Sequence, residues 1–322
     1  MLGVTDIHLP ATILLDRPGH SRGGFTNGSL SRTGSSRRSG FEVYVRMKDV
    51  PAQTRLAAEF SARIRAHALR MAHLANASHI GSSLSMADIL SVLYTRVLRV
   101  DHKRPDWPER DRLIVSKGHG AAILYAALAE REFFPLEWLK DYCKDGSKLL
   151  GHVSHHVPGV EVSTGSLGHG LPVGCGIALA AKREGHSIRT FVILSDGELD
   201  EGSNWEAILF AGHNRLDNLV AIVDYNKIQS FGRVRDILDL DPLPAKWAAF
   251  RWHSIEIDGH DLSQLEEALT RIPPEPGKPT AIIAHTVKGK GVSFMEDRLE
   301  WHYRSPDKEQ LERALGELGL SL

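Results

Sequence analysis

The sequence predicts an α/β fold: a mainly parallel sheet with helices on both faces. Two short apolar stretches, residues 191–194 and 219–223, are bounded by turn residues and are typical of buried strands. The stretch between them is helical in pattern, and Ser203 and Glu206 stand at the spacing of a capping box. A strand, a helix and a strand in this order form a right-handed crossover, so we expect the two strands to be parallel.

The remaining elements follow the same alternation of strands and helices. We expect strands at 112–116, 255–257 and 281–284, and helices at 121–130, 262–271 and 307–315. Two further helices are expected near the start, where Leu56, Phe60, Ile64 and Met71 have helical spacing and Ser85 with Asp88 caps a helix that runs to Leu98. In the central helix, we expect Trp205, Ile208 and Leu209 to face inward. Such alternation indicates a parallel sheet covered by helices.

Residues 1–50 differ from the rest in being rich in Ser, Gly and Arg. This composition predicts disorder. An organelle transit peptide is one interpretation. However, Met47 precedes the first helical pattern, so we favour a dispensable extension or a start-site artefact. Residues 51–322 are then expected to form one α/β domain.

Composition favours a soluble intracellular protein. The chain of 322 residues has 42% hydrophobic and 25% charged residues and a net charge of −1, and nothing suggests nucleic acid binding. Cys143 and Cys175 are too few for a disulfide framework and are expected to be buried thiols. No apolar run approaches the roughly 18 residues that cross a bilayer. We therefore expect a cytoplasmic protein without membrane contact.

Two oxygen-bearing side chains follow the two central strands. Asp196 comes shortly after the first strand and Asn226 after the second. Parallel strands present their carboxyl ends at one edge of the sheet, where ligands bind. Since Mg²⁺ prefers oxygen ligands and shares them with phosphates, this spacing suits a metal-bound diphosphate.

The region from Ser195 to Asn226 resembles the diphosphate-binding signature of thiamine diphosphate enzymes. Other segments resemble transketolase motifs in transketolase order: Asn76–Ser85, Ser116–Gly120, Gly151–Val153, Pro158–Gly170 and Thr286–Ser293. The resemblance covers roughly residues 54 to 305. Ser195 departs from the signature, which has Gly there, and Tyr225 stands where Asn is common. Neither departure removes a metal ligand.

The resemblance implies a thiamine diphosphate domain and its binding residues. The metal, Mg²⁺ with Ca²⁺ as an alternative, would be held by Asp196, Asn226 and the backbone carbonyl of Ile228. Glu201 would lie at the contact between two cofactor sites. The complete set of cofactor-binding residues implied is Gly165, Ser166, Leu167, Gly197, Glu201, Asn226 and His119.

Four of the 17 histidines fall in these motifs. Thiamine chemistry on sugars requires proton shuttles with a pKa near neutrality, which histidine supplies. By resemblance, His79 and His302 would handle hydroxyl protons, His119 would hold cofactor phosphate and substrate, and His152 would contact donor hydroxyls. The neighbours of His152 at 155 and 156 could suggest a metal cluster, but no Cys or carboxylate pattern accompanies them. The basic loop at Lys288 could bind a substrate phosphate or be a flexible loop.

We therefore expect the N-terminal subunit of a split transketolase, a transferase that moves a two-carbon ketol unit from a ketose phosphate to an aldose phosphate. A second chain would supply the pyrimidine domain within a heterotetramer in which this chain also self-associates. A non-catalytic regulatory subunit that binds thiamine diphosphate is one alternative, and a related enzyme acting on an unusual sugar is another. A nicotinamide-dependent dehydrogenase is disfavoured, because the glycines from Gly165 are spaced Gly-x-x-Gly-x-Gly.

Overall fold

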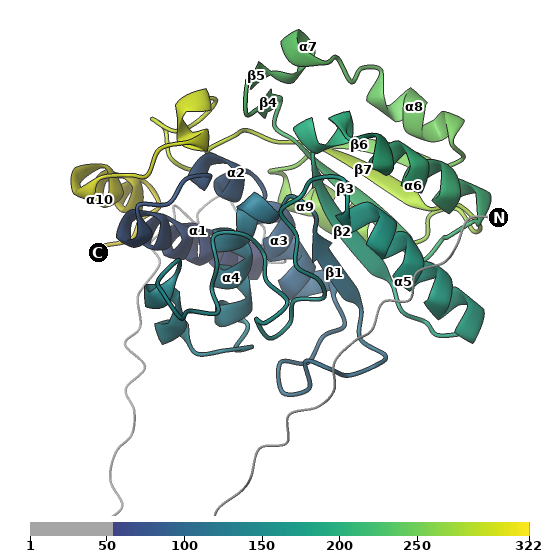
Figure 1. Ribbon diagram of the computed structural model, residues 1–322, viewed down its shortest axis with the longest axis horizontal. Coiled ribbons are helices and arrows are strands. Elements are labelled where there is room, and N and C mark those ends of the chain that lie inside the picture. The colour runs from purple at the N-terminus through teal and green to yellow at the C-terminus, as the bar shows by residue number, and fades with distance from the viewer. Residues whose placement is uncertain (1–53, 322) are drawn as a thin grey trace, which may run out of the picture. The chain divides into compact units, whose positions relative to one another are not determined.

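The structure, a computed structural model, describes residues 54–321, so the expected extension at 1–50 lies outside the described residues. A five-stranded sheet with the order β1-β2-β3-β7-β6 forms its centre, and every neighbouring pair is parallel (Figure 1). This confirms the predicted α/β fold. The strands are β1 (Arg112–Val115), β2 (Thr190–Ser195), β3 (Leu219–Tyr225), β6 (His253–Asp258) and β7 (Thr280–His285).

The central strands are buried on both faces, as their continuous apolar runs predict. In β2, Phe191 and Ile193 pack into one hydrophobic cluster, whereas Val192 and Leu194 pack into another on the opposite face. This alternation follows from the two-residue period of a strand. The sheet therefore separates two cores.

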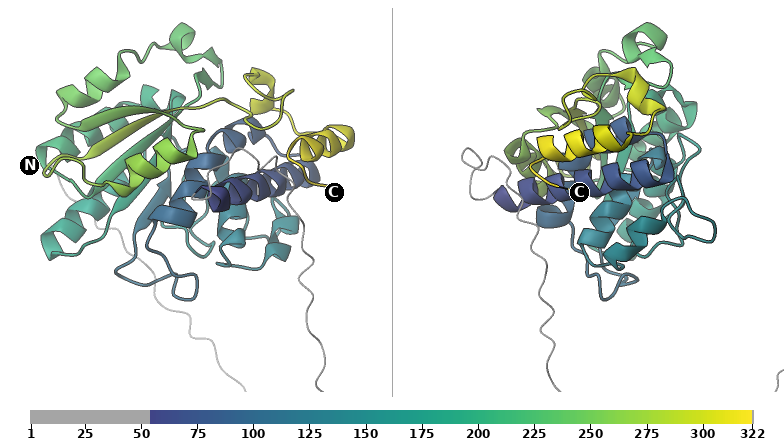
Figure 2. Two further views of the ribbon diagram at one scale, coloured as in Figure 1. Left: turned by 180° about the vertical axis from the view of Figure 1, so that it is seen from behind. Right: turned by 90° about the vertical axis from the view of Figure 1, so that its left-hand side faces the viewer.

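Helices cover both faces of the sheet (Figures 1 and 2). One face carries α5 (Gly170–Glu184), α6 (Gly202–His213) and α8 (Leu243–Ala249). The other carries α1 (Arg55–Ala75), α2 (Ile80–Ser85), α3 (Ala87–Val92), α4 (Ala121–Glu130) and α9 (Leu262–Thr270), and α10 (Lys308–Glu317) lies along α1. A small hairpin of β4 (Ile228–Gln229) and β5 (Gly232–Arg233) precedes the short α7 (Val234–Ile237).

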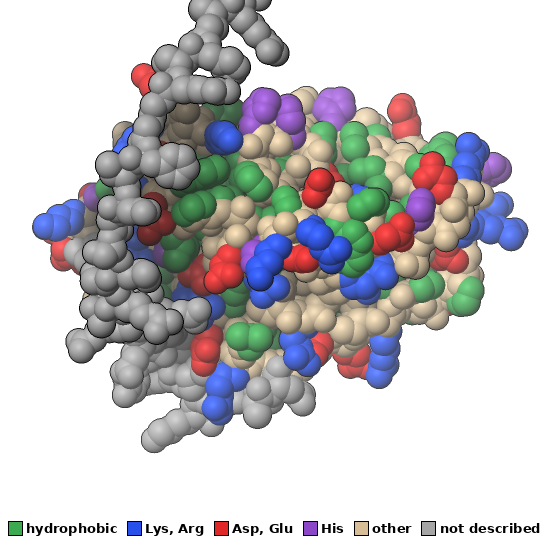
Figure 3. Space-filling view, turned by 90° about the horizontal axis from the view of Figure 1, so that it is seen from below, with side chains coloured by type: hydrophobic (Ala, Val, Ile, Leu, Met, Phe, Trp, Pro, Cys, Tyr) green, Lys and Arg blue, Asp and Glu red, His purple; other side chains and the backbone are tan. Residues whose placement is uncertain are grey.

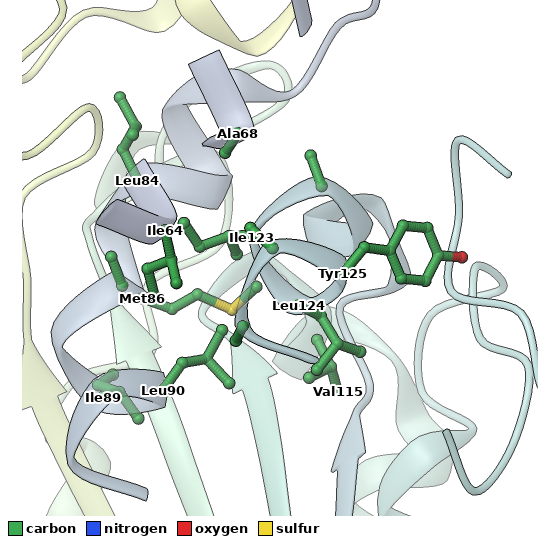
Figure 4. Close-up of a cluster of buried hydrophobic side chains, with 14 of the residues drawn as sticks. Ile64, Ala68, Leu84, Met86, Ile89, Leu90, Val115, Ile123, Leu124 and Tyr125 are labelled. Carbon is green, nitrogen blue, oxygen red and sulfur yellow. The ribbon is translucent and has the colours of Figure 1, made fainter. Parts of the chain in front are cut away.

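The core beneath α1 to α4 is closely packed around Met86 (Figure 4). Its side chain, which is fully buried, extends among Ile64, Leu90 and Leu124. A Cβ at Gly120 would lie 2.3 Å from the Met86 methyl group, so a larger residue there would displace the end of the Met86 side chain. The turn after β1 therefore packs directly against this core.

Several local predictions are wrong because tertiary contacts use the groups concerned. Ser203 does not cap α6; its hydroxyl donates to the Gly168 carbonyl at 2.8 Å, and Glu201 is the N-cap residue. Ser85 likewise donates to Asp224 at 2.6 Å; it is the last residue of α2, and Met86 is the N-cap residue of α3. Two burial predictions are also wrong, since Leu209 and Cys143 are exposed.

Charged side chains of both signs share the surface. On the face drawn in Figure 3, Lys and Arg side chains lie among Asp and Glu side chains, in keeping with the net charge of −1. Within residues 54–321, none of the helices is both long enough and apolar enough to cross a bilayer.

The approach of α6 to the segment after α8 can be tested with a glycine pair. A Cβ at Gly212 would lie 1.9 Å from the Phe250 carbonyl oxygen, so we expect Gly212→Ala to lower the free energy of unfolding by roughly 1–3 kcal/mol. Gly176 in α5 has nothing within 4 Å of its added Cβ, and Gly176→Ala should raise stability by about 0.5–1 kcal/mol. Chemical denaturation of both variants measures this, and equal effects would contradict the close approach.

Candidate active site

Segments at the carboxyl edge of the sheet surround one pocket. β1 leads into the turn 116–120, β2 into Asp196, β3 into Asn226 and β7 into the loop 286–289. On the other side, the His79 amide donates to the His302 carbonyl at 2.9 Å and joins the start of α2 to the turn at 299–302. The pocket measures about 680 Å³ with its open mouth and is lined by His79, Ser82, His119, His152, Gly165, Leu167, Ser195, Asp196, Gly197, Asn226, Ile228, Gln229, Ser230, Lys288 and His302.

Most of the predicted site residues meet in this pocket. They include the four predicted histidines, the three predicted metal ligands and parts of the predicted phosphate loop. Ser166 and Glu201 do not line it. Both are exposed, Ser166 in the loop before α5 and Glu201 at the N-terminus of α6.

The oxygen atoms of Asp196 and Asn226 are positioned by backbone amides. Asp196 accepts from the Gly197 amide at 2.8 Å and from the Lys227 amide at 2.5 Å, and the Asn226 side-chain oxygen accepts from the Ile228 amide at 3.1 Å. Burial, together with the Asp224 carboxylate, raises the pKa of Asp196 to about 6. No Lys or Arg within residues 54–321 forms an ion pair with Asp196.

This environment fits a bound cation. A buried carboxylate without a cationic partner is costly, and a divalent ion would remove that cost. The Ile228 carbonyl already accepts from the Lys288 ammonium at 2.9 Å, but a carbonyl oxygen has a second lone pair for a metal. Across the described part of the chain, no three His, Cys, Asp or Glu side chains form a metal-binding group. A cation at Asp196 would therefore depend on amide, carbonyl and phosphate oxygens as well.

A fully buried ion pair lies beneath the pocket. Lys117, from the turn after β1, contacts the Asp224 carboxylate of β3 at 2.5 Å and the Ser82 carbonyl of α2 at 2.9 Å. Asp224 also accepts from Ser85 and Thr286. Burial alone would raise the pKa of Asp224, but Lys117 and the donors around it hold that pKa below its usual value.

Glu198 organises the loop that precedes α5. Its buried carboxylate accepts from the Gly168 amide at 2.9 Å, from the Ser195 amide at 3.2 Å and from the Ser116 hydroxyl. Ser116 in turn accepts from the Gly170 amide at 3.0 Å. The ends of β1 and β2 are therefore linked directly to the loop that contains Gly165.

The four histidine rings form one cluster. The ring centre of His79 lies 5.3 Å from that of His119, 5.8 Å from that of His152 and 5.0 Å from that of His302. Burial is the largest cause that lowers the pKa of His79 to about 4 and that of His302 to about 3, and the nearby Lys117 and Lys288 add to it. Burial also lowers the pKa of His119 well below its usual value. These three rings are therefore neutral near pH 7.

The neutral state of His302 has a defined tautomer. Lys288, whose pKa is lowered to about 8 by burial against the opposing effect of Asp196, lies with its Nζ 3.0 Å from His302 Nδ1. An ammonium group can only donate, so Nδ1 accepts and the proton of the neutral ring is on Nε2.

The β4–β5 hairpin, which contributes Ile228, Gln229 and Ser230 to the pocket, is held by exposed contacts. The Tyr303 hydroxyl donates to the Ser230 carbonyl at 2.7 Å, and Arg233 donates to both carboxylate oxygens of Asp297. These contacts join the β4–β5 hairpin to the segment that leads to His302.

Several residues of this site have no role predicted from the sequence. Lys117 lies in the segment Ser116–Gly120, and Asp224 lies in the region from Ser195 to Asn226. In each of these segments, the sequence analysis gave a role to the residue two positions later, which is His119 in the first and Asn226 in the second. The available signal was a charged residue at or just after the end of an apolar strand. Ser82 lies within the motif Asn76–Ser85 but has no predicted role, and Gln229 and Ser230 carry no signal, since only the fold brings them to the pocket.

Comparisons with known proteins show the family to which this domain is similar. Residues 57–321 match the family described as "Transketolase, thiamine diphosphate binding domain". The chain is 50% identical to one of the subunits of the apulose-4-phosphate transketolase of Actinobacillus succinogenes, over 74% of this chain and 87% of the relative. It is 43% identical to the 6-deoxy-6-sulfo-D-fructose transketolase subunit SqwG of Clostridium sp. strain MSTE9, over 74% of this chain and 88% of the relative.

Solved structures show the same fold. Transketolase from Campylobacter jejuni superposes with a TM-score of 0.79 at 32% identity, over 84% of this chain and 44% of the solved chain. The chain thus spans less than half of that enzyme's length, whereas it spans most of the two subunit relatives.

The neutral histidines predict how stability depends on pH. In the unfolded chain a histidine protonates near pH 6.5, whereas folded His79 stays neutral until about pH 4. Between these values the unfolded state binds more protons, so the free energy of unfolding should fall as the pH is lowered through this window. Denaturation at pH 7, 6 and 5 measures the free energy of unfolding, and we expect it to fall less steeply with decreasing pH in His79→Asn than in the wild type. The control is His213→Asn at an exposed position. An equal pH dependence in the two variants would refute the assignment to His79.

Proposed function

The chain belongs to the family of transketolase thiamine diphosphate-binding domains, and from this premise we propose that it is one subunit of a two-chain transketolase. The complex transfers a two-carbon ketol unit from a ketose phosphate to an aldose phosphate. The observation that carries this proposal is the pocket in which four histidines meet Asp196 and Asn226. Proton-handling groups and hard oxygen ligands in one pocket suit sugar chemistry on a metal-bound diphosphate.

The residues at the inner end of the pocket would hold thiamine diphosphate. Asp196, Asn226 and the Ile228 carbonyl would hold Mg²⁺, or Ca²⁺ in its place, as hard oxygen ligands. Backbone amides of the loop at Gly165, Ser166 and Leu167 and of Gly197 would donate to its phosphate oxygens. When bound, the cofactor supplies the nucleophilic carbon that breaks and re-forms the carbon–carbon bond of the sugar.

Two buried lysines support this assignment. The Lys117 ammonium lies beneath the pocket beside Asp224, and the Lys288 ammonium lies in the pocket beside the Ile228 carbonyl. A bound diphosphate would be repelled by the carboxylates of Asp196 and Asp224. The two ammonium groups reduce this repulsion, which is strong in a site shielded from water. The side chain of Lys288 is almost fully buried, which suits this role better than a flexible loop or an open site for a substrate phosphate.

The histidines are suited to hold sugar hydroxyl groups and move their protons. His302 offers its Nε2 proton as a donor, because Lys288 occupies Nδ1. His79 is neutral near pH 7 and can accept a hydroxyl proton. His119 contacts cofactor phosphate and substrate at the inner end, and His152 contacts hydroxyls of the donor sugar. The ring centre of His79 lies 5.0 to 5.8 Å from those of the other three histidines, so the four rings can contact one sugar.

The other end of the cofactor would be covered by a second chain. The subunit names of the relatives support a partner, and by family resemblance that partner carries the pyrimidine domain with the carboxylate that activates the aminopyrimidine. We place the exposed Glu201, at the N-terminus of α6, in the contact between two copies of this chain, so that the assembly is a heterotetramer. Its setting is cytoplasmic carbohydrate metabolism of the pentose phosphate type.

A second candidate substrate class has its own support. The relatives named above act, by their names, on apulose 4-phosphate and on 6-deoxy-6-sulfo-D-fructose, neither of which is a common pentose or hexose phosphate. The same ketol transfer on an unusual sugar is therefore the alternative. Assays of the two-chain complex with these two sugars, beside an unsubstituted ketose phosphate, distinguish the alternatives.

The need for a partner leads to a direct prediction. The purified chain alone should show no ketol transfer with thiamine diphosphate, Mg²⁺ and sugar phosphates, and activity should appear on addition of the chain that carries the pyrimidine domain. A coupled assay titrated with that chain should saturate at equal molar amounts. Full activity of the chain by itself would refute the two-chain assignment.

The metal assignment predicts the effect of one substitution. Asp196→Ala should abolish Mg²⁺-dependent thiamine diphosphate binding to the two-chain complex, because a hard anionic ligand is lost. Isothermal calorimetry measures the affinity with Mg²⁺ and with EDTA. Asp236→Ala, which changes an exposed carboxylate on the nearby α7, is the control. Unchanged affinity in Asp196→Ala would exclude this residue as a ligand.

A further inference from the structure

The loop after β7 directs Lys288 into the pocket. Its backbone is fixed at three points: Thr286 donates to the Tyr225 carbonyl at 3.2 Å, Gly289 donates to the Gly81 carbonyl at 2.9 Å, and Val287 donates to a histidine side chain. The last contact differs from the others because its acceptor, His260, is a side chain and not a backbone carbonyl.

The contacts of His260 define its tautomer. The Val287 amide can only donate, so His260 Nε2, at 2.8 Å, must be the acceptor. The other ring nitrogen, Nδ1, lies 2.8 Å from a carboxylate oxygen of Asp88 and therefore carries the proton. The ring is consequently held between a carboxylate on α3 and the backbone of the loop after β7.

Asp88 is a fixed anionic anchor. Burial would raise its pKa, but Arg65 and the hydrogen bond from His260 hold it below its usual range. Arg65 contacts both carboxylate oxygens, at 2.6 and 2.9 Å, and Ser61 donates to one of them at 2.6 Å. The anchor belongs to α1 and α3, which are part of the closely packed core.

We propose that His260 is a positioning residue: with Asp88 behind it, it fixes the Val287 backbone and thereby directs the Lys288 ammonium to the phosphate end of the pocket. Lys288 follows Val287 directly, and its Nζ reaches the Ile228 carbonyl at 2.9 Å and His302 Nδ1 at 3.0 Å. A shift of the Val287 amide would move both contacts. The proposal rests on the proposed function in taking thiamine diphosphate with Mg²⁺ as the ligand that Lys288 faces.

Two substitutions separate the two contacts of His260. The amide oxygen of Gln in His260→Gln can take the place of Nε2 and accept from Val287, whereas the contact with Asp88 is lost. In His260→Asn the shorter amide can take the place of Nδ1 and donate to Asp88, whereas the acceptor for Val287 is lost. Each variant loses one hydrogen bond, so they form a matched pair, and thermal unfolding of both checks that they are folded.

Hydrogen exchange in the full chain without cofactor tests the positioning itself. In His260→Asn, exchange of the Val287 amide, followed in peptides covering 286–292, should be roughly fivefold to tenfold faster, as expected for one lost hydrogen bond. In His260→Gln it should stay within about twofold of the wild type, because an acceptor remains. Unchanged exchange in His260→Asn, or equal increases in both variants, would overturn the proposal.

Binding of thiamine diphosphate and Mg²⁺ to the two-chain complex tests the consequence for the ligand. His260→Asn should weaken binding about 10- to 100-fold, as loss of an outer hydrogen bond does at metal sites, and His260→Gln should restore most of it. Lys288→Met should weaken binding at least as much as His260→Asn. If Asp196→Ala abolishes binding but Lys288→Met does not weaken it, the proposed function stands and the positioning role is wrong. If the wild-type complex does not bind the cofactor, the proposed function fails, and the exchange experiment still decides whether His260 holds Val287.

Discussion

The buried ion pair between Lys117 and Asp224 is the interaction on which the candidate site depends most. It joins the turn after β1 to the end of β3, and hydrogen bonds from Ser85 and Thr286 connect it to α2 and to the loop after β7. His119 and Asn226 each lie two residues from one of its members. Loss of one partner of such a pair typically costs about 3–5 kcal/mol, because a charge is left buried without compensation. This buried pair and its hydrogen bonds therefore hold four pocket-forming segments together as one unit.

This unit explains the charge states in the pocket. Lys117 and Lys288 add to burial in keeping His79 and His302 neutral, whereas Asp224 adds to burial in raising the pKa of Asp196. Burial penalises charge of either sign, and the neighbouring groups decide how far each pKa moves. The result is a site with neutral proton-handling groups on one side and a carboxylate suited to a cation on the other. His260 belongs to a second set of contacts, anchored by Asp88, that meets this unit at the loop of Lys288.

The sequence was sufficient to predict the sheet and the parallel β2-α6-β3 unit, because the spacing of apolar residues and the turn residues that bound a strand are local signals. The same signals predicted that Asp196 and Asn226 lie at one edge of the sheet. It was insufficient where a side chain serves a distant part of the chain. Ser203 and Ser85 have the residue type and spacing of helix caps, yet their hydroxyls bind Gly168 and Asp224 instead. Leu209 is an apolar residue of a kind that is often buried, but it lies on the solvent-exposed side of helix α6. The partners of Lys117 and His260 are 107 and 172 residues away along the chain, so no local pattern could identify them.

The β4–β5 hairpin at the pocket is held less firmly than the residues beneath the pocket, which we call its floor. Beneath the pocket, Lys117 and Asp224 are buried charges, whereas the side chains of Arg233 and Asp297, which hold the hairpin, are 45% and 55% exposed to solvent. An exposed ion pair of this kind contributes about 0–1 kcal/mol and weakens with salt. Local fluctuations will therefore open the hairpin of β4 and β5 far more often than they disturb the floor. Ionic strength should therefore change the rates at which a ligand enters and leaves past this hairpin. It should have less effect on the positions of the side chains that hold the bound ligand.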